Sequence, residues 1–487
     1  MLELFAIALT IGAIFYRTLH ADWFVIFLLA FSCAAFLSFL FRSKKGILFS
    51  VAIGATVILG ALAVWRAEVT VPNGVFGTRA FDARVRSVDR RLDKTNLIVR
   101  DAVYGVNVQV STSDGEGMLP GDLVSIRALI NRPESFLTQT GRLFDYPQYL
   151  ESRGIVAVGN NAQVVLEKKG KWSPARFATT ARFAIADIFS RFVSFPTDGV
   201  LAGMTVGYQG GIPADVSDLF RVTGVLHVLV LSGYNITLLA GFLTLLLKPL
   251  PFKSRTIVTI AAIALLVLIS GSGIASIRAG IMGGIALFAG LARRTYQPLR
   301  ALTLAYVLFF VLTPTTIFSD PGFHLSFLAT AFMILVLPKV ETIFSFVPRT
   351  KHVDVRELLM LALTVPIFML PYTMYFSGLF PLASPFANIL LAVVTPLCMV
   401  AGVLLVVVSF ITPIGQLVGT LISSVGSVVL HALEFFSKLP SWNTPEISWW
   451  IVVLLYGTLL YILFKKEIRF YLLQLQNSLA PVTSSLP

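Results

Sequence analysis

The sequence predicts a polytopic α-helical membrane protein with a small extracytoplasmic β-barrel (OB-like) domain inserted after the third helix. Hydrophobic residues fill 56% of the 487 positions and charged residues only 13%, an apolar excess that a soluble chain of this size does not need. Most of the net charge of +13 lies in short loops between apolar runs, as the positive-inside rule expects of cytoplasmic loops. Membrane topology therefore explains the charge, which is weak evidence for nucleic-acid binding.

The N-terminal segment, residues 1–66, contains three apolar runs, at about 4–16, 23–41 and 46–65. Arg42, Lys44 and Lys45 place the turn after the second run in the cytoplasm, so the third helix emerges on the outer side. The first run follows no basic leader and precedes no clear small-residue cleavage site, which indicates a retained helix rather than a signal peptide.

Between residues 74 and 170 the pattern changes to alternating apolar and polar positions rich in Val and Ile. Five such stretches predict strands, at 81–89, 96–103, 106–113, 122–130 and 162–169. Turn signals separate them at Asp114-Gly115, Pro120-Gly121 and Gly159-Asn160-Asn161. Five strands in about 100 residues favour a small OB-like barrel.

An OB fold can bind a single nucleic-acid strand through a basic groove and stacking aromatics. Residues 74–170 hold thirteen Lys and Arg against eleven Asp and Glu, a difference of only +2. A solvated strand face is therefore favoured over a DNA-binding face.

Residues 175–195 place Phe177, Ile185 and Phe189 on one side with arginines between them, a pattern typical of an amphipathic helix at the membrane interface. The segment 201–208 is rich in small residues and too short to span a membrane, which favours a re-entrant or lateral position. Residues 198–466 are expected to form one polytopic domain, followed by a short tail at 467–487.

The stretch from Thr223 to Gly241 is long enough to cross a bilayer, yet it carries several polar side chains. Polar groups in hydrocarbon are costly and usually face a bundle interior or a water-filled cavity. If the helix is unbroken, His227, Ser232 and Asn235 fall within one arc of about 140°, although Gly233 could interrupt it. For the whole cluster a lined pathway is favoured over simple bonding between neighbouring helices.

Arg278 is an obligate cation among small and apolar side chains. If it lies deep in the membrane it must meet carbonyls, water or a polyanion, whereas near the outer interface it could snorkel to water. The bend expected at residues 270–273 leaves both depths open. Nearby glycines permit close helix approach; they are Gly271, Gly273, Gly280, Gly283 and Gly284.

Asp320 precedes an apolar run, where a carboxylate can cap the free N–H groups of a helix. His324 and Ser326 enter that helix and could line the same cavity as His227, and Asn388 lies at the start of a long apolar run. The other expected crossings are at about 256–274, 299–313, 357–378, 386–411, 416–438 and 449–464. Lys465 and Lys466 then place the C-terminus in the cytoplasm.

Several of these stretches resemble the ComEC-type competence proteins, the inner-membrane channel component of natural transformation. His227, Ser232 and Gly233 match the family's His-containing run and Ser-Gly segment, while Asn235 stands where the family commonly has a second His. The family usually has Gln at the position of His324, so the resemblance gives that residue no catalytic role. Further resembling strings lie at 141–155, 201–208 and 270–291 and around Asn388.

The resemblance implies a non-enzymatic channel in the bacterial inner membrane that admits single-stranded DNA to the cytoplasm. It also implies a cytoplasmic ATP-driven translocase and a separate DNA receptor as partners, and it leaves a homo-oligomer open. Full-length members often end in a metallo-β-lactamase-like domain with a His-x-His-x-Asp-His motif. The five His here form no such motif, and neither a metal site nor a cofactor is expected.

Two other classes of function remain as alternatives. A transporter of a small or lipid-linked anionic substrate would use the same polar residues but should show internal repeats, which are not evident. An intramembrane hydrolase would need a base beside its nucleophile; the spacing of His227 and Ser232 fits one helical face poorly, which makes this the weakest of the three.

Overall fold

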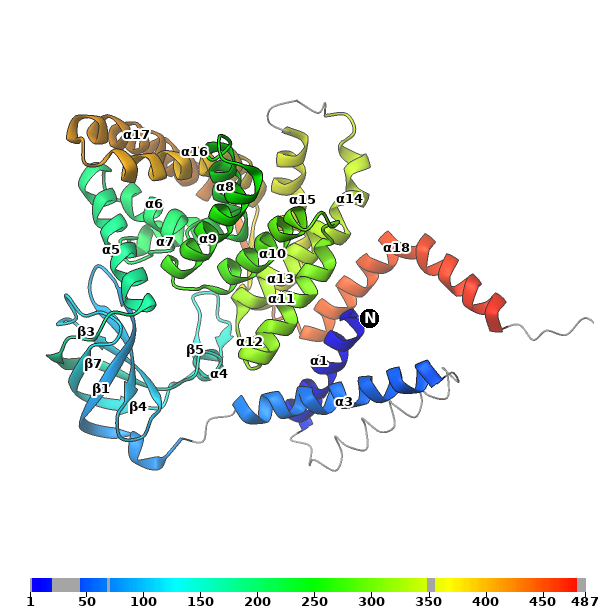
Figure 1. Cartoon of the computed structure of the whole chain (residues 1–487), viewed down its shortest axis with the longest axis horizontal. Helices are drawn as coiled ribbons and strands as arrows, with labels where there is room; N and C mark the ends of the chain where they lie inside the picture. Colours follow the sequence, from blue (N-terminus) through cyan, green and yellow to red (C-terminus); the bar gives the residue numbers. More distant parts are fainter. Residues whose placement is uncertain (1, 20–43, 68–70, 348–354, 480–487) are drawn as a thin grey trace, which may run out of the picture.

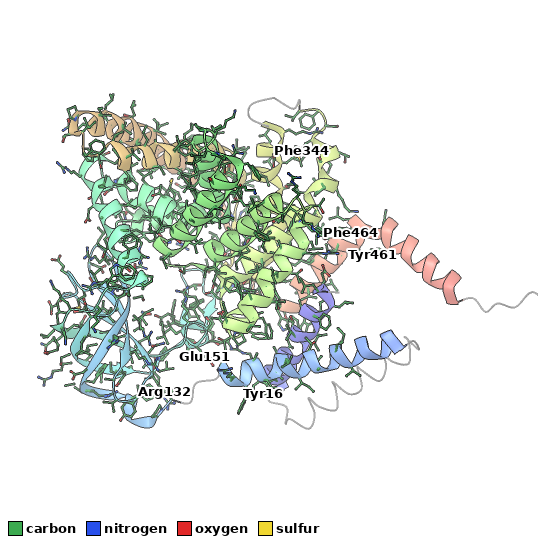
Figure 2. All side chains as sticks on the ribbon, in the orientation of Figure 1. Tyr16, Arg132, Glu151, Phe344, Tyr461 and Phe464 are labelled. Carbon is green, nitrogen blue, oxygen red and sulfur yellow. The ribbon has the colours of Figure 1, made fainter. Side chains whose placement is uncertain are left out.

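The computed structural model describes residues 2–19, 44–67, 71–347 and 355–479 (Figure 1). The apolar run expected at 23–41 and residues 480–487 of the expected tail lie outside these ranges. Figure 1 shows the β domain at one corner of the molecule, beneath a layer of helices formed by the middle of the chain. Side chains fill the barrel and the space between the helices (Figure 2).

Five helices of the described ranges are long and apolar enough to cross a membrane, or six spans if one bent helix pair is counted as one. The five are α9 (Phe252–Ile269), α10 (Ile274–Leu291), α15 (Val355–Ser377), α16 (Ser384–Val408) and α17 (Thr412–Ser437). The bent pair is α13 (Pro321–Leu335) with α14 (Leu337–Val340) and the 3-10 turn η3 (Glu341–Phe344), at 48°. The chain is thus a multi-pass helical membrane protein, as the composition predicts.

Five further helices contain shorter apolar stretches. They are α1 (Leu2–Leu19), α3 (Lys44–Ala67), α8 (Gly233–Leu246), α11 (Pro298–Leu312) and α18 (Trp449–Leu479). Since α18 continues to Leu479, the segment expected to be a tail from residue 467 begins as helix. A small antiparallel pair, β8 (Leu379–Pro381) with β9 (Ser441–Asn443), links the ends of α15 and α17.

The β domain contains all five predicted strands. They are β1 (Gly77–Arg90), β2 (Thr95–Asp101), β3 (Asn107–Thr112), β4 (Leu123–Asn131) and β7 (Ile155–Lys168), preceded by the turn η1 (Asn73–Val75). Their order, β1-β2-β3-β7-β4, closes because β1 pairs with both β2 and β4. The apolar residues of the alternating pattern point inward and form the barrel core; Leu97, Val99 and Val108 are examples.

Gly159-Asn160-Asn161 is not a turn, so this part of the sequence prediction is wrong. All three residues lie within β7, which runs without a break past them. Asn161 adopts a positive φ of 48°, and the pairing of β7 with β4 shifts register between Arg127 and Leu129. Asn tolerates this left-handed conformation, and the residues form an irregularity in the strand rather than its end.

Between β4 and β7 the chain makes an excursion, residues 132–154, that the sequence did not predict. It contains β5 (Phe136–Leu137), β6 (Leu143–Phe144) and α4 (Tyr146–Glu151), which Asp145 caps. Thr140 donates to the Ser377 carbonyl at the end of α15, at 2.6 Å. Glu151, marked in Figure 2, lies 4.0 Å from Arg17 of α1. The excursion therefore attaches the barrel to the helices.

Two helices connect the barrel to the rest of the bundle. The amphipathic helix expected near 175–195 is α5 (Pro174–Phe192), which buries Phe183 against the barrel and Phe189 against the bundle. The next helix, α6 (Thr197–Val206), packs against α5, α16 and α17 and buries every residue except Asp198. A lateral position for residues 201–208 is therefore wrong for the part that lies in α6.

Candidate functional site

The chain does not form one helix from Thr223 to Gly241; it is interrupted next to Gly233, one of the two possibilities that the sequence left open. After α7 (Ala214–Val222) come a single 3-10 turn, η2 (Leu226–Val228), and extended backbone at Ser232, and α8 begins only at Gly233. Ser232 is the N-cap: its Oγ accepts the Asn235 backbone N–H at 3.3 Å. The break separates His227 from the helical face that carries Asn235.

Ser232 and Asn235 form a small hydrogen-bonded unit at the start of α8. The Ser232 hydroxyl donates to the Asn235 side-chain oxygen at 2.9 Å, and the Asn235 amide donates to the Met204 carbonyl of α6 at 3.0 Å. Only 2% of Asn235 is exposed, so these bonds satisfy a buried amide. The unit fixes the start of α8 against α6.

His227 has a different environment. Its side chain is exposed on η2, between the buried residues Val225 and Val228. In the described ranges it makes no hydrogen bond, so no neighbour fixes its tautomer.

Arg278 lies inside the protein rather than at its surface. It belongs to α10, only 7% of it is exposed, and its guanidinium rests on Gly233 at the start of α8. A β-carbon on Gly233 would lie 2.5 Å from the Arg278 Nη2 atom, so glycine makes this approach possible. Of the two depths that the sequence left open, the snorkelling position does not fit this burial.

The Arg278 guanidinium has no acceptor in the described part of the chain. Its Nε is buried without a hydrogen bond, and neither a carboxylate nor a carbonyl pairs with its other nitrogens. A buried cation without a partner is costly. The first N–H groups of a helix also attract negative charge, and α8 begins at the same glycine. Arg278 and the α8 N-terminus thus present two sets of donors that suit an anion.

Asp320, His324 and Ser326 form a second polar group, on α13. The Asp320 carboxylate caps this helix, as expected, by accepting the N–H of Gly322 at 2.8 Å, and it pairs with Arg153 of the excursion at 3.4 Å. It is only 3% exposed. The cap and the ion pair give Asp320 a structural role that joins the barrel excursion to α13.

Both ring nitrogens of His324 are occupied. Its Nδ1 lies 2.7 Å from the Tyr372 hydroxyl of α15, and its Nε2 lies 2.6 Å from the carbonyl of Ile317, in the short helix α12 (Thr316–Ser319). The buried Ser326 hydroxyl has no partner in the described ranges. No hydrogen bond that the structure describes joins this group to Ser232, Asn235 or Arg278.

Asn388 lies beside the segment that leads to His227. Its amide donates to the backbone and hydroxyl oxygens of Ser384, at 2.8 and 3.0 Å. Ser384 in turn touches Gly224, which has a positive φ of 75° and no room for a side chain. Thus the described structure brings Ser232, Gly233, Asn235 and Arg278 together and places Asn388 next to the same loop.

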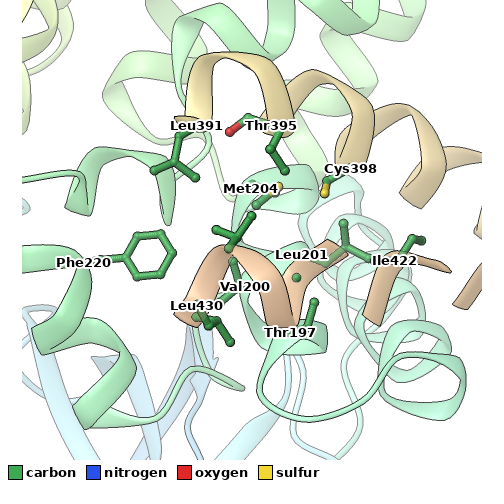
Figure 3. A pocket seen from close by; sticks show the side chains of 13 residues that line it. Thr197, Val200, Leu201, Met204, Phe220, Leu391, Thr395, Cys398, Ile422 and Leu430 are labelled. Atoms are coloured by element: carbon green, nitrogen blue, oxygen red, sulfur yellow. The ribbon is translucent and has the colours of Figure 1, made fainter. Parts of the chain in front are cut away.

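A small apolar cavity lies beside this group, between α6, α16 and α17 (Figure 3). Its volume is about 30 Å³, and Leu201, Met204 and Cys398 are among the side chains that line it. The Thr395 hydroxyl beside them is buried and has no partner among the residues that the structure describes. This space holds about two water molecules, which is far too little for a nucleotide.

Comparison with known proteins gives two matches, which cover different shares of the chain. The sequence model of the competence protein family matches residues 204–469. A relative, ComE operon protein 3 of Bacillus subtilis (strain 168), is 25% identical over 244 residues, which are 47% of this chain and 30% of that protein. The chain therefore matches less than a third of this relative's length. No solved structure matches it.

Sequence reasoning did not find Arg142 and Arg153 of the excursion, which both bond to the helical bundle. Both lie in a string that resembles the competence family, 141–155, and this was the available signal. Among the described residues, no group of three or more His, Cys, Asp or Glu is placed to hold a metal ion.

Proposed function

Since this chain belongs to the competence protein family, we propose that it forms the inner-membrane channel through which single-stranded DNA enters the cytoplasm during natural transformation. The family match covers the five long apolar helices and the candidate site from Met204 onward. The relative from Bacillus subtilis carries the name of a competence operon product, which supports the same assignment.

The observation that carries the proposal is the unpaired Arg278 guanidinium against the start of α8. A phosphate diester that passes this point gains a charge-assisted hydrogen bond and meets the positive end of a helix. Both donors act in a site of low water content, where their interaction with an anion is strong. Phosphate contacts carry no sequence information, so such a site accepts any DNA sequence.

The side chains around Arg278 have supporting roles in this proposal. Ser232 and Asn235 hold the α8 N-terminus in place, and Gly233 lets the guanidinium reach it. His227 lies in the loop before α8 and Asn388 lies beside this loop on α16. Both are proposed to line the path together with Asp320, His324 and Ser326. Since the adjoining cavity is small and apolar, the path opens only when DNA and its partners engage the protein.

The proposed arrangement places the barrel on the extracytoplasmic side of the inner membrane and the C-terminus in the cytoplasm. Basic residues at the ends of apolar runs support this orientation. The strand order β1-β2-β3-β7-β4 supports an OB-type barrel. The sequence carries no nucleotide-binding loop, so energy for transport comes from a cytoplasmic ATP-driven translocase, and a separate receptor delivers the DNA.

The test is uptake of fluorescent DNA into the cytoplasm of a transformable bacterium whose own family member is deleted. The intact chain should restore uptake, Arg278→Ala should not, and His227→Ala should reduce it. Arg278→Lys keeps a positive charge and should restore part of the uptake. Arg84→Ala, at an exposed barrel position, is the matched control and should behave as the intact chain.

Equal membrane levels of each variant must be shown by immunoblot. Normal uptake with Arg278→Ala at normal membrane level would contradict the proposed path. If the intact chain fails to restore uptake, and deletion in its own host leaves uptake unchanged, the DNA hypothesis is wrong. In that case a transporter for a small or lipid-linked anion becomes the better hypothesis, because the same cation suits a single phosphate equally.

A further inference from the structure

Two arginines meet where the barrel joins the helical bundle. Arg90 ends β1, and Arg182 lies in the middle of α5. Both guanidiniums contact the ring of Phe183, with the central carbons 4.1 and 5.8 Å from its centroid. Phe183 itself is buried in the barrel core and touches Tyr208 edge-on at 5.7 Å. The two cations are therefore held in place by one fixed aromatic ring.

Neither guanidinium has an acceptor in the described structure. The Nε atoms of Arg90 and Arg182 are both buried without a hydrogen bond. The nearest acid that influences Arg182 is Asp89, which is half-exposed and already paired with Arg91 at 3.0 Å. Burial lowers the pKa of Arg182, while Asp89 and Tyr208 act in the opposite direction. Stacking on a ring leaves the in-plane N–H groups of a guanidinium free to bind an anion.

The backbone around the two arginines consists of glycine at the points of contact. Gly210 touches the Arg90 carbonyl so closely that a β-carbon has no room. A β-carbon on Gly271, which has a positive φ of 80°, would lie 2.5 Å from the Arg182 Nη1 atom. Side chains at these positions would displace the strand or the guanidinium. Glycine thus lets the backbone approach the Arg182 guanidinium at Gly271 and the backbone of β1 at Gly210.

The junction leads toward Arg278. Gly271, beside Arg182, lies two residues before Gly273, the N-cap of α10, and Arg278 is in the second turn of that helix. At about 1.5 Å per residue, roughly 8 Å of helix axis separate Gly273 from Arg278. A single strand that contacts Arg182 beside Gly271 is therefore close to the helix that carries Arg278.

We propose that Arg90 and Arg182 form a receiving site for the phosphate backbone of a single strand, one step before Arg278. This inference rests on the proposed function and adds a contact that lies before the family match, which begins at residue 204. The site consists of two ring-stacked guanidiniums, so it binds backbone phosphate without regard to sequence. It connects the barrel to the helical path.

The test measures binding of a fluorescent 30-nucleotide single strand to the full chain in lipid nanodiscs at several salt concentrations. Each phosphate neutralised on a single strand adds about 0.7 to the slope of log affinity against log salt. The double variant Arg90→Gln and Arg182→Gln should therefore lower this slope by about 1.4. Arg84→Gln, on the exposed face of the same strand β1, is the matched control and should leave the slope unchanged.

A neutral-backbone oligonucleotide of the same sequence should bind the intact chain and the double variant equally. Replacement of both arginines by Lys keeps the charge and should restore the slope, and thermal unfolding checks that each variant is folded. If the Gln double variant does not fold, the two single Gln variants are measured instead, with an expected slope change of about 0.7 each.

The outcomes separate this inference from the proposed function. If the intact chain binds the strand and the folded Gln variants keep the full slope, the junction site is wrong and the channel proposal stands. A loss that the Lys variants do not restore also overturns the site, because charge is then not its cause. If the intact chain binds no single strand and restores no uptake, both proposals fail together.

Discussion

Two arginines of this chain are buried to the same extent in different surroundings. Arg142, in the barrel excursion, and Arg278, in α10, are each 7% exposed. The Arg142 Nη2 donates to the carbonyl of Thr444 at 3.1 Å and to that of Pro445, between α17 and α18. Arg278 has no acceptor in the described ranges. Two arginines that are equally buried can therefore differ in whether the protein supplies hydrogen-bond acceptors for the charge.

The comparison separates a cation that backbone carbonyls bind from a cation without an acceptor in the described ranges. At Arg142 the protein supplies the carbonyls that replace water, so the charge holds the excursion against the bundle. Gly378, at a positive φ of 67°, lets the backbone approach the Arg142 Nε atom to the point where a β-carbon would lie 2.8 Å away. At Arg278 a glycine again permits close approach, but what it approaches is another set of donors. The proposed function assigns that charge to an external anion.

The largest effect is expected when Met replaces each arginine in turn. Arg142→Met removes charge-assisted bonds and frees the excursion, and should destabilise the protein by about 2–4 kcal/mol. Arg278→Met removes an unpaired buried charge, and should leave stability unchanged or raise it by about 1–4 kcal/mol. Thermal unfolding midpoints in nanodiscs measure both. The distinction between a paired and an unpaired arginine is wrong if Arg278→Met destabilises the protein as much as Arg142→Met does.

A smaller effect concerns a second junction between the barrel and a helix, at Asp122. Asp122 is completely buried at the base of the barrel, where it accepts the N–H of Gly170 at 2.6 Å and a bond from Arg176 of α5 at 2.5 Å. Burial opposes its charge, but these bonds together with the N–H of Leu119 lower the pKa of Asp122 below its ordinary value.

Because the folded-state pKa of Asp122 is depressed, its stabilisation is present above the unfolded-state pKa of about 3.9 and is lost as pH falls toward the folded value. The thermal midpoint should therefore fall between about pH 5 and pH 3, and Asp122→Asn should weaken this dependence. Measurement of both midpoints over this range provides the check. If the thermal midpoints of the intact chain and of Asp122→Asn depend on pH in the same way, the contact of Asp122 with α5 is not the source of the pH dependence.

The fold was predictable where a single periodicity governs the chain. Burial alternates along most of each strand, without exception in β2, and the long helices have apolar windows of 18 residues or more. The excursion was not predictable, because strands of two residues carry no period and their position depends on Arg142 and Arg153 meeting distant helices. At Gly159–Asn161 the sequence carries a clear local signal, but it was misinterpreted. Residues that favour turns also suit an irregularity within a strand, and here they lie within β7.

The candidate site was predictable in its residues but not in its geometry. The polar cluster near Ser232 and the lone Arg278 are visible in the sequence, because both interrupt apolar runs. That Arg278 meets Gly233 depends on the break before α8 and on the packing of α10 against α8, which are tertiary properties. The proposed receiving site was not visible in the sequence, because Arg90 and Arg182 stand among other arginines and only the structure places both on Phe183.

The smallest effect separates the channel from an intramembrane hydrolase. In the structure the Ser232 hydroxyl caps α8 and bonds to Asn235, while His227 lies across the break, so Ser232 has a complete structural role and no bonded base. Ser232→Ala should thus cost about 1 kcal/mol of stability, as the loss of a helix cap does, and leave DNA uptake largely intact. Uptake of fluorescent DNA and thermal unfolding of the same variant measure the two consequences. A nucleophile cannot lose its oxygen and keep its reaction, so abolished function in a stable Ser232→Ala protein would instead favour the hydrolase, with Arg278 then binding the anionic group of its substrate.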